Sequence, residues 1–433
     1  MYRRITVGLL GAALVVAACG GGSEGTPAAS GGGGGGGGDL AGKVVKVMGG
    51  FSGAEGDAFI ESFKAFEDAT GVDVQYNGVS GMEQQLNVAV TAGNAPDVAL
   101  IPQPGTMQTY VDQGHLVPLT DDIIALIDAN YGPGWKELGT ASDGKAYGVF
   151  HRVNVKAQVF YPKVAFDAAG YAAPTTWAEL EALQAQIVAD GGTPWCIGLD
   201  VGWVATDWME AIMLRTVGAE AYDGWTSHAT PFASDGVKNA ANVMMKVMGD
   251  ESLAYGGPTY LIQTGWDVPP KLAFSDPPQC WFTNMGNFVT AAFTDEVNAD
   301  LDNQVGVFEL PSIDVPAGDV ASLVGGDQLT AFADRPEIWA FLEYIATPES
   351  SVTWAKAGGA LFPYKDQDVS NYPSQLYQTF ATDLAAAANV RFDGSDLMPS
   401  AVGAGSFWSE MLKMVGGQDV DTTMTNIDAT WPS

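Results

Sequence analysis

The sequence predicts an α/β fold in which a parallel sheet carries helices on both faces. Three strand-like segments, at residues 43–48, 72–76 and 97–101, alternate with two segments of helical periodicity. Strands that alternate with helices usually pair in parallel, because each helix leads the chain back across the sheet. Residues 97–101 (DVALI) are nearly all apolar, as expected for the buried centre of such a sheet.

The two helices between these strands have local start and stop signals. In the first, three aromatic side chains recur at helical spacing and Gly71 follows as the stop: Phe59, Phe63 and Phe66. The second helix, residues 82–92, is stopped at Gly93. These signals place the early strands and helices before any tertiary argument is needed.

Further along, the chain first becomes extended and then mostly helical. Residues 146–161 are predicted to be largely extended after a turn at 143–145. A helix is expected after Pro174, because Thr176 and Glu179 have the spacing of a capping box. Three later segments also have helical patterns or composition: 235–248, 335–346 and 381–388.

The first forty residues predict export and membrane attachment. Two arginines precede an apolar run at residues 5–18 that is shorter than the ~20 residues needed to cross a bilayer, which is typical of a secretory signal. Cys19 at its end resembles the lipidated cysteine of a bacterial lipobox. We therefore expect a signal peptide at 1–18, lipidation of Cys19 and a glycine-rich tether at 19–42. The alternative is an ordinary secreted protein with a low-complexity leader.

Composition excludes several classes of function. The chain has 51 acidic against 19 basic residues and a formal net charge of −32, so nucleic acid should be repelled. The 47% hydrophobic content indicates a globular protein, and about 390 residues after the leader suit two domains. The three histidines have no metal-ligand spacing with the cysteines, so we expect no metal and no cofactor.

Two cysteines remain after the leader, Cys196 and Cys280. In an oxidising compartment they most simply pair, which would stabilise the fold by roughly 4–5 kcal/mol through loop closure. Two buried free thiols are the alternative.

Several motifs resemble the extracellular solute-binding proteins of carbohydrate ABC importers, the group that includes maltose- and alpha-glucoside-binding proteins. They occur in order along most of the chain: AGNAPDV at 92–98, DGKAYGV at 143–149, VFYPK at 159–163, PTTWAEL at 174–180 and AFLEYIATPE at 340–349. Further segments are similar to the alpha-glucoside branch, in which the two cysteines form a bridge: TPWCIG at 193–198, ATDW at 205–208 and CWF at 280–282.

The resemblance implies a two-lobe fold like that of the type II periplasmic binding proteins, with three hinge crossings. Carried onto this chain, lobe one would be residues 43–152 plus 285–324, and lobe two residues 153–284 plus 325–433. The crossings would fall near 151–155, 282–286 and 325–329. Closure of the lobes over a ligand would occur at these crossings.

A sugar presents C–H faces to aromatic rings and hydroxyl rims to planar polar side chains, which should lie on loops at strand ends. In lobe one this predicts Phe51, Ser52 and Glu55 after the first strand, although Glu55 could simply favour a helix N-terminus. Gln103 follows the central strand, with a plain turn as its alternative. His151 and Arg152 lie at a crossing, where His151 is either a ligand contact or a hydrogen-bonded hinge residue.

In lobe two, aromatic and carboxylate side chains concentrate between residues 195 and 208. The candidate contacts there are Trp195, Asp200, Trp203 and Asp207, whereas Trp208 is expected in the core. The other two crossings contribute Trp281, Asn284 and Asp327. Arg391 and Trp408 are weaker candidates, and Arg391 could serve only to anchor the C-terminal segment.

We therefore expect a lipid-anchored substrate-binding protein on the extracellular face of the cell membrane, not an enzyme. It would act as a monomer, capture a neutral oligosaccharide such as an alpha-glucoside, and deliver it to the transmembrane subunits of an ABC permease. The alternatives are a binding protein for a peptide or polyamine and an extracellular glycoside hydrolase, which also uses carboxylates in a cleft. The sequence has no GxSxG, HExxH or P-loop motif.

Overall fold

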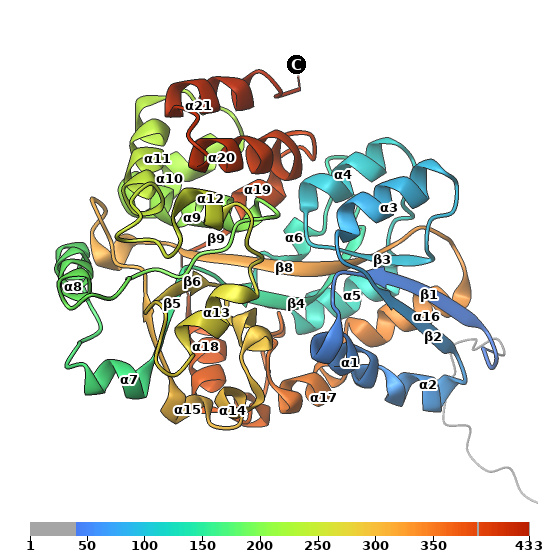
Figure 1. The fold of residues 1–433 in the computed structure, drawn as a ribbon. Helices are drawn as coiled ribbons and strands as arrows, with labels where there is room; N and C mark the ends of the chain where they lie inside the picture. Colours follow the sequence, from blue (N-terminus) through green and yellow to red (C-terminus); the bar gives the residue numbers. More distant parts are fainter. Residues whose placement is uncertain (1–39, 388, 433) are drawn as a thin grey trace, which may run out of the picture. The chain divides into compact units, whose positions relative to one another are not determined.

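Two β-sheets organise the chain in the computed structural model, which describes residues 40–387 and 389–432 (Figure 1). The predicted signal peptide, Cys19 and all but the end of the predicted tether lie outside these residues. The tether was expected to reach residue 42, but Leu40 packs against the core and the Gly42 N–H donates to the Gly71 carbonyl at 2.8 Å. Residues 40–42, the end of the predicted tether, therefore pack against the rest of the described structure.

The larger sheet has the strand order β2-β1-β3-β8-β4, with β9 paired to β8. Its strands are β1 (Val44–Gly49), β2 (Asp73–Gly78), β3 (Val98–Ile101), β4 (Gly148–Val155), β8 (Ser322–Ala331) and β9 (Val390–Phe392). The first three pair in parallel as predicted, but β8 lies antiparallel between β3 and β4. The sheet is therefore mixed, because its centre is completed by a strand from much later in the chain.

Helices cover both faces of this sheet, as predicted (Figure 1). Alternate side chains of β3 point to opposite faces of the sheet. Ala99 and Ile101 pack with α3 and α4, whereas Val98 and Leu100 belong to the core on the other face. The helices of this part of the chain are α1 (Gly53–Ser62), α2 (Lys64–Thr70), α3 (Met82–Thr91), α4 (Pro104–Asp112), α5 (Asp121–Asn130), α6 (Trp135–Leu138), α16 (Pro336–Ile345) and α17 (Glu349–Ala357). The helix expected around residues 59–66 is broken at Phe63, where α1 ends and α2 begins.

The smaller sheet is antiparallel, with β5 (Gln158–Pro162) between β6 (Thr283–Met285) and β7 (Val305–Glu309). Near it lie α7 (Lys163–Ala168), α13 (Val268–Ala273), η1 (Asn287–Ala292), α14 (Asp295–Asn298), α15 (Leu301–Gln304) and α18 (Gln375–Ala386). The predicted extended stretch 146–161 thus becomes two strands, one in each sheet.

A second group of helices forms the rest of the structure. It comprises α8 (Trp177–Ala189), α9 (Trp203–Thr216), α10 (Ala219–Thr226), α11 (Asp235–Met248), α12 (Gly257–Leu261), α19 (Gly394–Leu397), the π-helix η4 (Val402–Phe407), α20 (Trp408–Val415) and α21 (Val420–Asp428). The predicted capping box of α8 is present, with Thr176 and Glu179 each accepting from the other's backbone N–H. The predicted helix 235–248 is also confirmed as α11.

The packing does not follow the lobe boundaries expected from the sequence. Strand β7, from the range 285–324 expected in lobe one, pairs with β5, from the range expected in lobe two. Helices α16 and α17, expected in lobe two, contact β1, α5 and α1. The reason is that β5 completes its ladder with β6 and β7, so the chain does not return to the larger sheet until β8 (Figure 1). Residues 282–286, expected as a crossing, include β6 and remain beside β5.

Cys196 and Cys280 form a disulfide, with Cα atoms 5.5 Å apart, across 84 positions of sequence. The pairing predicted from the cysteine count is therefore confirmed, and two free thiols are excluded. Among the helices in the described ranges, we find none that combines the length and apolarity of a membrane span.

Candidate functional site

Arg152 lies at the centre of the first part of the site, where four segments of the chain meet. It is 8% exposed on β4, its Nε donates to Asp327 Oδ2 of β8 at 2.9 Å, and its Nη1 pairs with Glu55 of α1. Its guanidinium lies 4.5 Å from the Phe51 ring centroid and 5.6 Å from that of Phe288. The site therefore has a charged centre between two aromatic rings.

The charges in this group are perturbed by burial. Burial raises the pKa values of Glu55 and Asp327, and the nearby Arg152 only partly offsets that rise. Burial would lower the pKa of Arg152, but the two carboxylates outweigh it and the net shift is upward. The guanidinium thus stays charged and holds two carboxylates, whose remaining lone pairs can accept hydrogen bonds from hydroxyl groups.

Lys156 forms the second part, one residue beyond the end of β4. Its Nζ donates to Asp207 Oδ1 at 2.8 Å and also pairs with Asp393, while Asp393 accepts from the Ser395 hydroxyl at 2.8 Å. Glu210 holds the same loop by accepting from the Ser395 N–H at 3.0 Å. Together these contacts join β4, α9 and the start of α19 through buried charges.

More carboxylates than cations are buried around Lys156. Burial raises the pKa of Asp207 to about 8, against the lowering influence of Lys156, and it also raises the pKa of Glu210. Burial alone would raise the pKa of Asp393 too, yet Lys156 and neighbouring hydrogen bonds hold it below its usual value. Electrostatic coupling of Lys156 to Asp327 links this cluster to the Arg152 group.

Aromatic rings line the adjacent part of the site. Trp203, Trp266 and Phe288 contact one another with ring centroids 5.8–6.2 Å apart, and each is only half-buried. Trp203 is the first residue of α9 and its ring centroid lies 6.0 Å from Lys156 Nζ. Rings that keep an exposed face beside buried polar groups can stack on an apolar patch of a ligand.

Close backbone packing brings Trp408 near this aromatic group. Gly202, just before α9, has φ of 87°, and a Cβ built there would lie 2.7 Å from Trp408 Cβ. Only glycine permits this approach in that left-handed conformation. Trp408 follows the π-helix η4 and its Nε1 donates to Ser395 Oγ at 3.4 Å. π-Helical turns are frequent at functional sites.

Six of the predicted residues therefore lie in the two linked groups: Phe51, Glu55, Arg152, Asp327, Trp203 and Asp207. Ser52 is exposed just before α1, and Asp200 is exposed in the loop before α9. Gln103, 3% exposed, bonds Glu83 through Nε2 at 3.4 Å, while its Oε1 has no partner in the described structure. The weaker candidate Trp408 also lies close to the site.

Three other predicted contacts, Trp195, Trp281 and Asn284, instead pack against residues of the fold. Trp195 is 1% exposed and packs against Trp208 and Phe282, which also confirms Trp208 as a core residue. Trp281 packs against Phe166 and Tyr171. Asn284 is buried within β6.

Two further candidates have structural partners away from the site. His151 is fully buried among Phe59, Trp354 and Phe362, and burial lowers its pKa to about 3, so it stays neutral. Arg391 donates to Asp223 at 2.5 Å, consistent with an anchoring role.

Sequence reasoning missed Lys156, Trp266, Phe288 and Asp393. A lysine directly after the extended segment that forms β4 was a usable signal, because a charge next to a buried strand needs a partner. The other three residues lie far apart in sequence and only the fold brings them together. In the part of the chain that the structure describes, no group of His, Cys, Asp and Glu side chains has an arrangement that could hold a metal ion.

Comparisons with known proteins agree with this architecture. The profile of a family described as bacterial extracellular solute-binding protein matches residues 50–352. The osmoprotective compounds-binding protein GgtB of Synechocystis sp. is 37% identical over 396 residues, covering 90% of this chain and 93% of that protein. The alpha-glucosides-binding periplasmic protein AglE of Rhizobium meliloti is 34% identical, covering 91% of this chain and 88% of its own length.

Solved structures have the same fold at lower identity. The bacterial solute receptor AcbH has a TM-score of 0.79 at 19% identity, covering 89% of this chain and 98% of its own. Maltose-bound MalE3 of T. maritima has a TM-score of 0.71 at 16% identity, with coverages of 89% and 98%. At this level of identity the likeness concerns the two-lobe α/β fold.

Proposed function

This chain belongs to the bacterial extracellular solute-binding protein family, and on that premise we propose that it captures a small neutral oligosaccharide, by preference an alpha-glucoside, for an ABC importer. The observation that carries the proposal is the joining of half-buried aromatic rings to buried carboxylates, with Trp203 beside Lys156 and Asp207. Rings bind the C–H faces of a sugar, and carboxylates accept hydrogen bonds from its hydroxyls.

The relatives favour the alpha-glucoside over other sugars. One relative with 34% identity over most of its length is named for binding alpha-glucosides, and another with 37% identity for binding osmoprotective compounds. The charge of the site supports a ligand rich in hydroxyl donors, because Glu55 and Asp327 beside Arg152 are acceptors when ionised. Because the site holds more carboxylates than cations, a cationic polyamine is the alternative ligand that the binding experiment should include.

The proposed mechanism is closure of two lobes around the sugar. Strands β4 and β8 run side by side between the two groups of elements, and Arg152 and Asp327 lie on them. A rotation along this strand pair would separate the Phe51 loop from Phe288 and open the site. The sugar would favour the closed arrangement only to the extent that it binds that state more tightly.

Delivery and location complete the proposal. A protein of this family works outside the cytoplasmic membrane, and the closed, loaded form would dock on the permease. Acylation of Cys19 and the glycine-rich segment would keep the monomeric receptor near that permease. The proposal includes no reaction on the sugar, which would be released unchanged.

Calorimetric titration tests the function directly. We expect at least one of maltose, trehalose and sucrose to bind, and Trp203→Ala to raise its dissociation constant at least tenfold. Trp177→Ala is the matched control, since Trp177 is half-buried at the start of α8 and bonds Glu181, and should change the constant less than twofold. Binding of spermidine but of no sugar would overturn the proposal, as would recovery of cleaved sugar by mass spectrometry.

A further inference from the structure

The backbone of Phe51, in the loop between β1 and α1, is held by one side-chain hydroxyl. Tyr76 of β2 donates from its Oη to the Phe51 carbonyl at 3.0 Å and accepts from the Phe51 N–H at 2.9 Å. Among the residues that the structure describes, we find no other hydrogen bond to these two groups. Phe51 is 3% exposed, so water does not take the place of Tyr76 there. The Tyr76 hydroxyl therefore fixes the path of this loop.

The surrounding chain leaves room for the hydroxyl. Strands β1 and β2 end at a pair of glycines, Gly49 and Gly78. A Cβ built at Gly49 would lie 2.8 Å from Tyr76 Oη, and one built at Gly78 would lie 2.0 Å from the Phe51 carbonyl oxygen, so glycine at both positions permits the close approach. The Tyr76 ring packs edge-on against Phe59, with centroids 4.9 Å apart. Phenylalanine at position 76 would therefore keep this packing and lose only the two hydrogen bonds.

Phe51 in turn supports the charged centre of the candidate site. Its ring centroid lies 4.5 Å from the Arg152 guanidinium. The same loop leads directly into α1, whose first turn carries Glu55, the partner of Arg152. A shift of the loop would therefore move both the ring beside the guanidinium and the carboxylate that the guanidinium holds.

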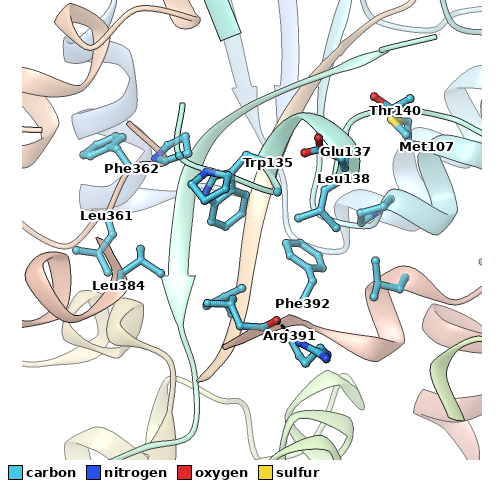
Figure 2. Close-up of a pocket in the computed structure, with 18 of the residues that line it drawn as sticks. Met107, Trp135, Glu137, Leu138, Thr140, Leu361, Phe362, Leu384, Arg391 and Phe392 are labelled. Carbon is cyan, nitrogen blue, oxygen red and sulfur yellow. Dashed lines mark hydrogen bonds between the residues drawn. The ribbon is translucent and has the colours of Figure 1, made fainter. Parts of the chain in front are cut away.

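The opposite face of the central strands does not supply this support. There a cavity of about 1220 Å³ borders β8 at Val324 and has apolar walls that include Phe392 (Figure 2). Side chains alternate along a strand, so Val324 points away from the face on which Asp327 pairs with Arg152. These two charges are therefore held by packing on their own face, where the Phe51 ring lies.

We propose that Tyr76 is a positioning residue for sugar binding, which holds the Phe51 loop, and with it Arg152 and Glu55, in the binding arrangement before the ligand arrives. This role rests on the sugar site proposed above. A protein whose binding arrangement is only partly populated has its apparent affinity reduced by that fraction. Loss of the Tyr76 hydroxyl should therefore weaken sugar binding, although it removes no group that we assign to the ligand.

Hydrogen exchange in the whole folded chain tests the positioning without a ligand. In Tyr76→Phe the Phe51 amide should exchange about tenfold faster or more, because its N–H has lost its acceptor. Tyr344→Phe is the matched control, since Tyr344 is also half-buried and its hydroxyl donates to the Ser62 backbone carbonyl at 2.7 Å. The control should leave the Phe51 rate within about twofold. An unchanged rate in Tyr76→Phe would overturn the proposal.

Calorimetric titration with maltose, trehalose or sucrose, whichever binds the native protein, tests the role in binding. Tyr76→Phe should raise the dissociation constant about fivefold or more, and Tyr344→Phe less than about twofold. In a Phe51→Leu background the further effect of Tyr76→Phe should fall below about twofold, because the ring through which it acts is gone.

The outcomes separate this role from the proposed function. If a sugar binds the native protein and Tyr76→Phe either leaves its affinity unchanged or weakens it equally in both backgrounds, the role of Tyr76 is refuted and the proposed function stands. If no sugar binds the native protein, the proposed function fails and the role in binding fails with it. Circular dichroism and melting temperatures of the variants show whether each one folds.

Discussion

Replacing Arg152 by methionine tests whether the centre of the site depends on a buried cation. The change keeps most of the side-chain volume but leaves Glu55 and Asp327 buried without their partner. The side chains of Arg152 and Asp327 are each 10% exposed. Removing one member of a buried ion pair costs about 3–5 kcal/mol, because the remaining charge loses its compensation.

The matched control is Arg391→Met, which breaks an ion pair with Asp223 whose side chains are 29% and 52% exposed. Exposed pairs contribute about 0–1 kcal/mol. A folded unit of this size unfolds with an entropy of roughly 0.8 kcal/mol per kelvin, so we expect melting temperatures lowered by about 4–6 °C for Arg152→Met and by about 1 °C or less for the control.

The stability of the variant should change with pH in a predictable direction. The pKa values of Glu55 and Asp327 are already raised by burial, and loss of Arg152 should raise them further. A carboxylate whose folded pKa exceeds its unfolded value binds more protons when folded, so the variant should regain stability as the pH falls from 8 to 5. Differential scanning fluorimetry at both pH values measures this.

Two outcomes decide the matter. If Arg152→Met and Arg391→Met lower the melting temperature equally at pH 8, the reasoning from burial is refuted. If the single variant does not fold, the double variant Arg152→Met with Asp327→Asn should recover at least half of the loss, since it removes one of the stranded charges.

Two further predictions concern the disulfide and the second charged cluster. Replacing both Cys196 and Cys280 by alanine should destabilise the protein by about 4–5 kcal/mol in urea titrations, because the bond closes a loop across 84 positions; a loss below 1 kcal/mol would contradict this. For Asp207, whose folded pKa is about 8 against 3.8 for an exposed aspartate, the folded state keeps a proton that the unfolded chain has lost. The associated stability is complete below pH 4 and is lost as the pH rises toward 8, so Asp207→Asn should show a shallower decline of melting temperature between pH 5 and 8; parallel curves would exclude this role.

Much of the fold could be predicted from local sequence signals. The strand at residues 43–48, the helix 235–248 and the capping box at Thr176 depend on neighbours a few positions apart, and all three are present. Glu55, Arg152 and Asp327 were each predicted as candidate contacts from separate segments, after a strand or at a crossing, and the structure places them in one ion-paired group. Trp195 shows the limit of that approach, because the same composition also describes a packed core.

The direction and partners of the central strands could not be predicted in this way. Strand β8 reverses the sheet and β7 pairs with β5, and both pairings join residues more than 140 positions apart. Backbone hydrogen bonding is the same for every sequence, so register and partner depend on which faces of the whole chain can be buried together. The expected lobe boundaries were wrong for that reason.

The sequence by itself determined the class of fold, the acidic character, the cysteine pair and the family motifs, since each is set by composition or by short-range spacing. Only the tertiary structure decided that Lys156, Trp266, Phe288 and Asp393 are brought together in the groups around Arg152 and Lys156. The physical reason is that packing between distant segments desolvates these charges and leaves these rings only half-buried. No local sequence pattern encodes that packing.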